Sequence, residues 1–268
     1  MPVLLFFIAH WYLSLFTQTF FHHRYSAHKA FTMSPFWEKV FFVLSLIFQG
    51  SSYLSPRAYG IMHRMHHAYA DTENDPHSPL FSKNVFEMMW KTKKIYHNIF
   101  YKRVELEKAF TERVPDWPAF DKFADFWPVR IFWVFFYTAF YIIFDASWWM
   151  YLTLLPIQFI MGPFHGAIIN WFAHKLGYVS FKVRNTSTNL LFFDFLMLGE
   201  SYHNNHHKFP RRVNFGIKWH ELDPIYPFIL LFNLLGIIKV GKQPSVSVSE
   251  HRVVESVETT EQAVMEPF

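Results

Sequence analysis

Long apolar stretches alternate with polar segments along this chain. Three of the stretches have about the 20 residues that a membrane-spanning helix requires; they are residues 3–21, 126–144 and 148–172. Only Asp145-Ala146-Ser147 separates the second from the third, and so short a break predicts a helical hairpin that turns outside the membrane. The pattern therefore predicts an all-α integral membrane protein with about three transmembrane helices.

Other apolar stretches are too short to span a bilayer and are expected to lie at its surface or to re-enter it; they are residues 40–48, 190–198 and 225–238. Residues 83–125 are polar and rich in Lys and Arg, which is typical of amphipathic segments that face anionic headgroups. The apolar pattern ends near residue 241. We therefore expect one membrane domain, 1–240, and a disordered tail, 241–268.

Charge sets the expected orientation. No Lys or Arg precedes the first apolar stretch and Arg24 follows it, so the positive-inside rule places the N-terminus outside and the polar cap in the cytosol. The chain is 51% hydrophobic and its net charge of +4 comes from loops, which indicates contact with membrane lipid and no nucleic-acid partner. The absence of cysteine excludes thiolate ligands and iron–sulfur clusters.

Histidine is concentrated at the ends of the apolar stretches. Neutral histidine is a common metal ligand. The three clusters are His23 and His28, then His63, His66 and His67, then His203, His206 and His207. In addition, His174 follows Asn170 by four residues. The H-x-x-H-H pattern occurs twice, and its three imidazoles share one face of a helix. These nine histidines exceed the three or four protein ligands of one zinc ion, so two metal ions are expected.

Carboxylates are too few for one familiar alternative. Ferritin-like di-iron proteins use two Glu-x-x-His motifs, and here only Glu200 with His203 fits. We expect Asp71, Asp75 and Glu200 to orient imidazole N–H groups. The further candidates for orienting ligands or contacting a substrate are His77 and His220. An all-nitrogen centre of two metals is suited to activating O2, with structural zinc as the alternative.

At these residues the sequence resembles the membrane fatty acid desaturases, specifically the acyl-CoA (stearoyl-CoA type) delta-9 group. The resemblance extends from the first apolar stretch to about residue 240. It rests on HRYSAH (23–28), HRMHHAYADTENDPHSP (63–79), Asn170 with His174, GESYHNNHHKFP (199–210) and Trp219-His220-Glu221. It implies a cytosolic helical cap that holds a di-iron centre, with O2 as co-substrate and two electrons from a carrier protein. Two hydrogens would leave adjacent methylenes, giving a cis double bond and two waters.

The resemblance also assigns roles to residues. It places the iron ligands at the nine clustered histidines, with Asn170 contacting iron through water. It places the far end of an acyl tunnel about three helical turns before His23, near Trp11 and Leu15. A position in the aromatic belt of the membrane interface is the alternative role of Trp11.

The sequence departs from the family pattern in three places. Residues 3–21 resemble the family's second span, so we expect three spans in place of the family's usual four. The 268 residues contain no His-Pro-Gly-Gly signature of a cytochrome b5 domain, so we expect a separate ferredoxin- or cytochrome b5-type electron donor with its reductase. Ile61 and Met62 stand where acyl-CoA enzymes place the Arg-Asp that contacts CoA. Acyl-carrier protein or a glycerolipid is thus the alternative to acyl-CoA as the carrier. The expected location is a bacterial inner membrane, with the histidines facing the cytoplasm.

Other functions are the alternatives to desaturation. A hydroxylase or another lipid oxidase would use the same histidines. A non-enzymatic haem protein is disfavoured, because its axial histidines would stand singly inside spans. A metal transporter needs a series of polar groups at mid-membrane. The candidates for such a role are His10, Gln18, Gln158 and His165, and they form no evident series.

Overall fold

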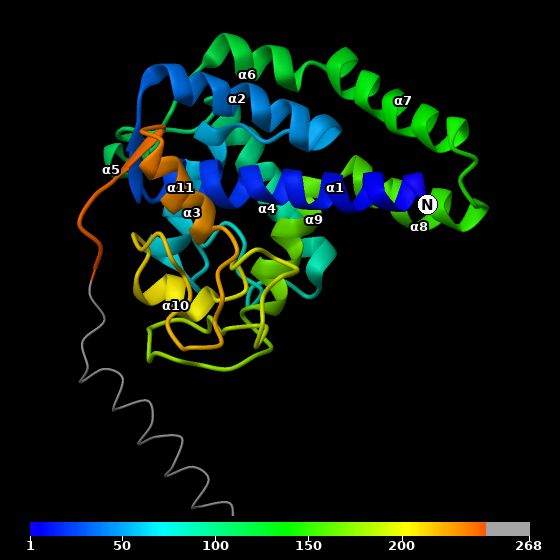
Figure 1. The fold of residues 1–268 in the computed structure, drawn as a ribbon. Helices are drawn as coiled ribbons and strands as arrows, with labels where there is room; N and C mark the ends of the chain where they lie inside the picture. Colours follow the sequence, from blue (N-terminus) through cyan, green and yellow to red (C-terminus); the bar gives the residue numbers. More distant parts are fainter. Residues whose placement is uncertain (245–268) are drawn as a thin grey trace, which may run out of the picture.

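The computed structural model describes residues 1–244, and the rest of the predicted tail, 245–268, lies outside the described residues. Helices make up most of this part (Figure 1). They pack around α1 (Pro2–Thr17), while much of the C-terminal third is irregular chain gathered around α10 (His203–Lys208).

The first predicted span is a single long helix. α1 continues without a break into a π-helix, η1 (Gln18–Ala27). Pro2 stands in the first turn, where its missing N–H costs nothing. Within the described residues, Pro2–Ala27 is the one continuous helix long and apolar enough to cross a membrane.

The next helices return the chain to the start of the histidine-bearing region. After β1 (Phe31–Met33), α2 (Pro35–Gln49) packs along α1. Its 15 residues rise only about 22 Å, which agrees with the prediction that 40–48 is too short to span. A short 3₁₀ turn, η2 (Gly50–Ser52), leads to α3 (Pro56–Tyr69), whose first turn is capped by the Ser55 hydroxyl.

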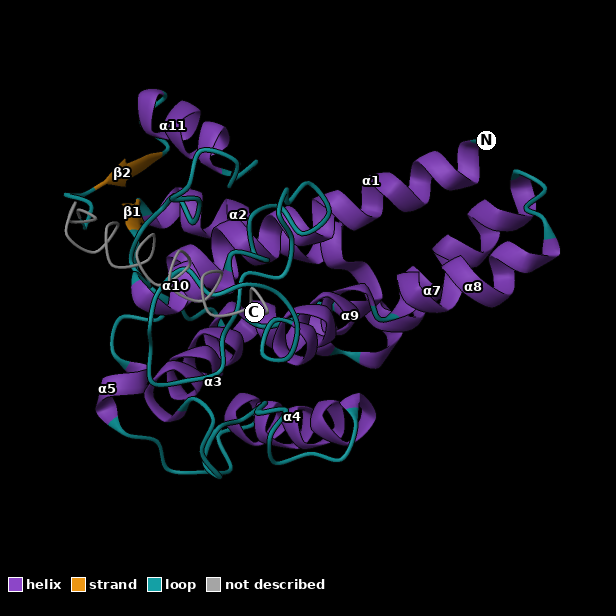
Figure 2. Ribbon diagram, turned by 90° about the horizontal axis from the view of Figure 1, so that it is seen from below, coloured by secondary structure: helices purple, strands orange, loops and turns teal. Residues whose placement is uncertain are grey.

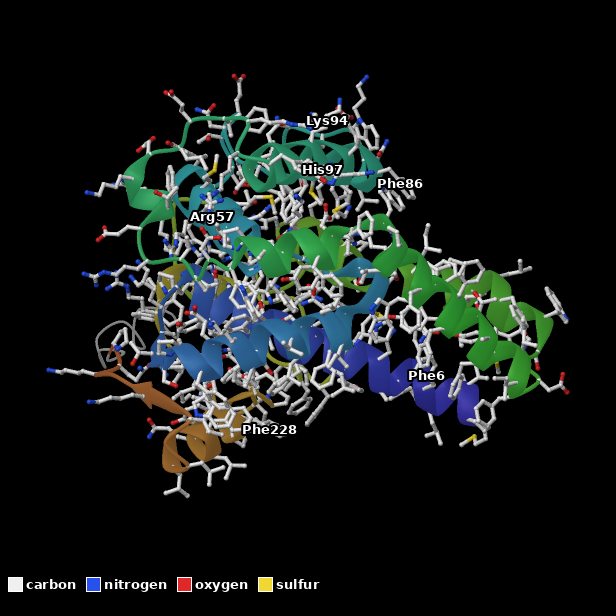
Figure 3. The ribbon with its side chains drawn as sticks, turned by 90° about the horizontal axis from the view of Figure 1, so that it is seen from above. Phe6, Arg57, Phe86, Lys94, His97 and Phe228 are labelled. Atoms are coloured by element: carbon white, nitrogen blue, oxygen red, sulfur yellow. The ribbon has the colours of Figure 1, made fainter. Side chains whose placement is uncertain are left out.

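The basic segment forms three helices on the outside of the molecule. They are α4 (Val85–Phe100), α5 (Lys108–Thr111) and α6 (Pro118–Asp125). Figure 3 shows Lys94 and Phe86 of α4 directed away from the rest of the molecule, and the Phe86 side chain is 82% exposed. This mixture of exposed cations and apolar groups is the one predicted for a helix at the headgroups.

The predicted hairpin is present, but its second arm is broken. α7 (Trp127–Ile143) and α8 (Trp148–Phe159) form the hairpin, and α9 (Met161–Ala167) with the π-helix η3 (Ile168–Phe172) follows. The chain bends by 83° between α8 and α9 and by 52° between α6 and α7, so the described part has one span, or up to three if each bent pair counts as one. Pro156 lies inside α8, close to the 83° bend, and removes a helical hydrogen bond there, while Pro163 stands in the first turn of α9, where no intrahelical partner is lost.

The all-α expectation is incomplete in one detail. β2 (Ile238–Val240), which follows α11 (Tyr226–Leu234), pairs antiparallel with β1, with Phe31 opposite Val240 (Figure 2). Within residues 241–244, the described start of the predicted tail, Gln243 still contacts the fold, because the Val213 N–H donates to Gln243 Oε1 at 2.9 Å.

The core and the outer surface are both apolar. Phe20, Phe21 and Phe42 are fully buried between η1 and α2. On α7 and α8, however, many large apolar side chains are exposed, among them Phe135 at 69% and Trp148 at 75%. Such a continuous exposed apolar surface is typical of helices that face lipid.

Candidate metal centre

The nine predicted ligands come together in two groups. They are carried by η1, α3, α10 and the turn after η3. In each group, one ring nitrogen of every member lies within 4.8 Å of the others. One group is His23, His28, His63, His67 and His206, and the other is His66, His174, His203 and His207.

The π-helix explains why His23 and His28, five residues apart, point to the same side. Residues five apart point in different directions on an α-helix. In η1 the hydrogen bonds instead span five residues, and the His28 N–H donates to the His23 carbonyl at 3.1 Å. The centroids of the two imidazole rings are consequently 5.0 Å apart, and both residues belong to the five-histidine group.

Each H-x-x-H-H motif serves both groups. The pair at i and i+4 in α3, His63 and His67, belongs to the five-histidine group, while His66 belongs to the other. In α10 the assignment is reversed, since His203 and His207 join His66, and His206 joins His63. The two groups are therefore adjacent, with the rings of His67 and His207 stacked at 4.4 Å.

Three carboxylates lie beside the outer nitrogens of three imidazoles, and they are Glu200, Asp75 and Asp71, the residues singled out in the sequence. Glu200 Oε2 lies 2.6 Å from His23 Nδ1, and Asp75 Oδ1 lies 2.9 Å from His66 Nδ1. Asp71 Oδ1 is 3.6 Å from His174 Nδ1. A carboxylate accepts the Nδ1 proton and so leaves Nε2 as the bare, coordinating nitrogen.

The donor set fits a metal cation. The Nε2 atom of His206 lies 2.9 Å from that of His23 and 2.8 Å from that of His67. Because His23 Nδ1 carries its proton towards Glu200, its Nε2 lone pair faces other ring nitrogens. Ligand nitrogens that surround one metal ion at bond lengths of about 2.0–2.1 Å lie about 3 Å from one another, as these nitrogens do. All nine donors are imidazoles, which suit iron as well as zinc.

The electrostatics favour the neutral, ligating form of the histidines. Burial, reinforced by the neighbouring imidazoles, holds the pKa well below the ordinary 6.5 for His63, His66, His67, His203, His206 and His207. Burial alone would raise the pKa of Glu200, but His23, Arg24 and Thr19 outweigh it and hold that pKa below its usual value. Glu200 is thereby kept as the acceptor for His23.

Arg24 connects the first cluster to the C-terminal loops, a role that its sequence position did not reveal. Its guanidinium is fully buried, pairs with Glu200 at 3.2 Å and Asp223 at 2.7 Å, and lies 3.7 Å above the Phe215 ring. Asp223 is 199 residues away in sequence, so no local pattern could have identified this ion pair.

Two uncharged side chains also contact outer nitrogens of the ligand histidines. Thr186 Oγ1 lies 3.2 Å from His174 Nδ1, and Asn185 Nδ2 lies 3.1 Å from His207 Nδ1. Both belong to the polar loop that follows η3, and sequence reasoning missed them. The run Asn185-Thr186-Ser187-Thr188-Asn189 was the available signal.

A small cavity of about 50 Å³ adjoins the histidines. Leu15, His77 and Asn170 line it together with His23, His63 and His203. The structure thus brings three more of the predicted residues to the centre, and the His77 ring also lies tilted against the His66 ring, with centroids 4.2 Å apart.

Two predicted residues lie further away. Trp11 does not line the cavity but packs behind it, edge-on to His165 at 4.4 Å, with its indole N–H donating to the Leu196 carbonyl. His165 lines the cavity and stands between it and Trp11. His220 stacks on Phe192 at 3.8 Å and belongs to neither histidine group.

Comparison with known proteins agrees with this geometry. The family model for fatty acid desaturase matches residues 1–231. The chain belongs to the fatty acid desaturase family. As a desaturase it is an oxidoreductase that acts on fatty acyl chains.

Three relatives illustrate the range of this similarity. Delta-9 desaturase-like 5 protein of Arabidopsis thaliana is 29% identical over 230 residues, covering 85% of this desaturase and 72% of the relative. The sn-1 stearoyl-lipid 9-desaturase of Anabaena variabilis is 27% identical over 219 residues, with coverages of 80% and 74%. Acyl-CoA 5-desaturase AL21 of Anemone leveillei is 27% identical over 238 residues, with coverages of 86% and 68%.

Proposed function

We propose that this desaturase inserts a cis double bond at the delta-9 position of a saturated acyl chain, using two iron ions and O2. The observation that carries the proposal is the pair of buried histidine groups, one of five and one of four members. Nine imidazoles without any cysteine make a dinuclear, redox-active centre the simplest use of this donor set. When bound, the two iron ions would supply the activation of O2.

The protein's own residues would prepare the ligands and position the chain. Glu200 and Asp75 fix which nitrogen of His23 and of His66 is free to bind iron. The cavity between Leu15 and the histidines would hold the methylenes that lose hydrogen. Because the acyl chain is flexible, much of the catalytic gain is expected from holding it in one place.

The overall reaction balances once two electrons and two protons are supplied. Two C–H bonds on adjacent methylenes break and a C=C bond forms, while O2 takes up those two hydrogens, two electrons and two protons to give two waters. We propose that the electrons come from a separate ferredoxin- or cytochrome b5-type donor and its reductase. Acyl-CoA is the proposed carrier, with acyl-carrier protein and glycerolipid as the alternatives. The proposed location is a bacterial inner membrane with the histidines facing the cytoplasm.

The test is expression in a host that cannot make unsaturated fatty acids, followed by gas chromatography–mass spectrometry of the lipid fatty acids. The wild type is expected to yield a monounsaturated acid, and His206→Ala none. His97→Ala removes a histidine of α4 that belongs to neither group and should keep the product. The position of the double bond follows from the same spectra.

Iron analysis of the purified protein tests the centre itself. About two iron ions per chain are expected for the wild type and for His97→Ala, and fewer for His206→Ala. A hydroxy acid in place of the alkene would replace desaturation by hydroxylation. Zinc in both positions, with no oxidised product, would overturn the proposal.

A further inference from the structure

A second and larger cavity, of about 400 Å³, lies away from the histidines. It is enclosed by the start of α3, the end of α4, α6 and the start of α7, and it shares no lining residue with the cavity at the metal centre. Arg57 marks this region in Figure 3. Nothing in the proposed reaction uses this cavity.

A buried carboxylate in its lining lacks a cation. Asp121 is 6% exposed and accepts hydrogen bonds from Tyr53 Oη at 2.7 Å and Ser55 Oγ at 2.6 Å, and no cationic nitrogen within residues 1–244 lies within 4.0 Å of it. The other two lining carboxylates differ, because Asp125 pairs with Arg130 at 2.7 Å and Asp116 with Arg57 at 3.6 Å. Buried charges are rarely left without a partner of opposite charge.

The cavity walls suit an ammonium group. Phe100, Tyr101, Phe126 and Trp127 line it, and most of its surface is apolar. Aromatic faces attract ammonium ions through their quadrupole, an attraction that strengthens when water is excluded. A primary or quaternary amine would therefore satisfy Asp121 and the aromatic rings together.

The rim suits an anion. The exposed side chains of Lys102 and Lys122 also line the cavity, and neither ammonium group forms a salt bridge or hydrogen bond within the described residues. A ligand with an amine inside and a phosphate at the rim would match both features.

The position of the cavity indicates the source of such a ligand. Trp127 begins α7, the first arm of the apolar hairpin, and is 73% exposed, while Phe126 beside it is 59% exposed. Aromatic side chains at the end of a spanning helix lie at the level of the lipid headgroups. Amine-bearing glycerophospholipids carry an ammonium and a phosphate at this depth.

We propose that this cavity binds the headgroup of an amine-bearing glycerophospholipid such as phosphatidylethanolamine. The ammonium lies against Asp121 and the aromatic walls, and the phosphate lies between Lys102 and Lys122. The site is separate from the metal centre and needs neither iron nor turnover.

Native mass spectrometry of the full chain in detergent tests the proposal, with dihexanoyl phosphatidylethanolamine as the probe. One bound lipid per chain is expected. Asp121→Asn should weaken it by about tenfold, the loss of one contact to a charged group, and should leave binding of dihexanoyl phosphatidylglycerol, which has no amine, unchanged. Asp145→Asn, in the exposed hairpin turn, is the matched control and should bind as the wild type does.

Further variants separate the two halves of the headgroup. Lys102→Glu combined with Lys122→Glu should weaken both lipids, whereas Lys94→Glu on the exposed face of α4 should weaken neither. Trp127→Ala alters only an exposed wall and should weaken phosphatidylethanolamine alone, so it keeps the test valid if Asp121→Asn does not fold. Inorganic phosphate or ethanolamine at the same concentration should not displace the lipid.

Three results would overturn the proposal. The first is that Asp121→Asn and Trp127→Ala bind phosphatidylethanolamine as tightly as the wild type does. The others are that the control variants lose as much lipid binding as the test variants, or that inorganic phosphate alone displaces the lipid. Repeating the titration with His206→Ala distinguishes this site from the metal centre. Lipid binding should be unchanged in that variant, even though its iron content and its activity are expected to fall.

Discussion

One hydrogen bond decides which nitrogen of His23 is free. Glu200 Oε2 lies 2.6 Å from Nδ1 and is itself held by Arg24 at 3.2 Å. This arrangement couples the charge of a buried ion pair to the coordinating Nε2 atom. The same logic applies to Asp75 and His66, where the distance is 2.9 Å.

Glu200→Gln tests this coupling. The amide keeps the shape of the side chain but loses the charge that favours a protonated Nδ1. We expect iron affinity to fall by about 10- to 100-fold, the usual effect of losing a carboxylate behind a ligating histidine. Competition with a chelator measures it, and Glu87→Gln on the exposed first turn of α4 is the control. Unchanged affinity in Glu200→Gln would show that the carboxylate does not tune the ligand.

Trp11→Ala tests the far end of the proposed acyl tunnel. Trp11 backs His165 and is fixed by its hydrogen bond to the Leu196 carbonyl at 3.0 Å. Removing the indole opens space beyond the present cavity of about 50 Å³, so products with longer acyl chains are expected. Chain-length analysis of the monounsaturated acids measures the shift, and an unchanged profile would remove Trp11 from the tunnel.

At the scale of elements, the site depends on how closely α3 approaches η1. Gly60 of α3 lies against Ser26, and a Cβ at position 60 would stand 2.3 Å from the Ser26 Oγ and 3.2 Å from its backbone carbon. The missing side chain thus permits the contact that brings His63 beside His23, with ring centroids 4.3 Å apart.

Gly60→Val should separate the two helices. Overpacking of this kind costs about 1–3 kcal/mol, and the displacement should lower the iron content because both histidine groups include residues of α3. Thermal unfolding and iron analysis measure the two effects. Ala68→Val adds similar volume on the exposed part of α3 and should change neither. Full iron occupancy in Gly60→Val would contradict this account of the packing.

At the scale of the whole molecule, the buried histidines make stability depend on pH. Six of them, on α3 and α10, have a pKa well below 6.5 in the fold. In the unfolded chain they would take up protons near pH 6.5. Below that pH the unfolded state therefore binds more protons than the folded state, and acid favours unfolding.

We expect the metal-free protein to keep its stability above pH 7 and to lose it progressively as the pH falls below 6.5. Each histidine that stays neutral in the fold contributes about 1.4 kcal/mol per pH unit. Denaturant unfolding after chelation, at a series of pH values, measures the slope. His206→Ala should reduce the slope of the unfolding free energy against pH by the contribution of one histidine, about 1.4 kcal/mol per pH unit. A free energy of unfolding that rose on acidification would contradict the assignment of neutral imidazoles.

Local patterns in the sequence determined much of this protein. Apolar length marked the first span and the hairpin, and histidine spacing selected the nine residues that come together, because side chains three and four apart share a helix face whatever the helix packs against. The scarcity of Glu-x-x-His motifs pointed to Asp71, Asp75 and Glu200 as partners of imidazole N–H groups rather than as ligands. These features depend on residues close in sequence or on chemistry that few residue types can supply.

Only the tertiary structure decided how these parts combine. It divided each H-x-x-H-H motif between two groups, brought Arg24 to Asp223, paired β1 with β2 and bent the predicted span of residues 148–172 by 83°. Each of these outcomes depends on contacts between residues that are distant in sequence, or on a backbone bend that the rest of the fold fixes. Their energies come from packing and buried charge, which periodicity along the chain does not report.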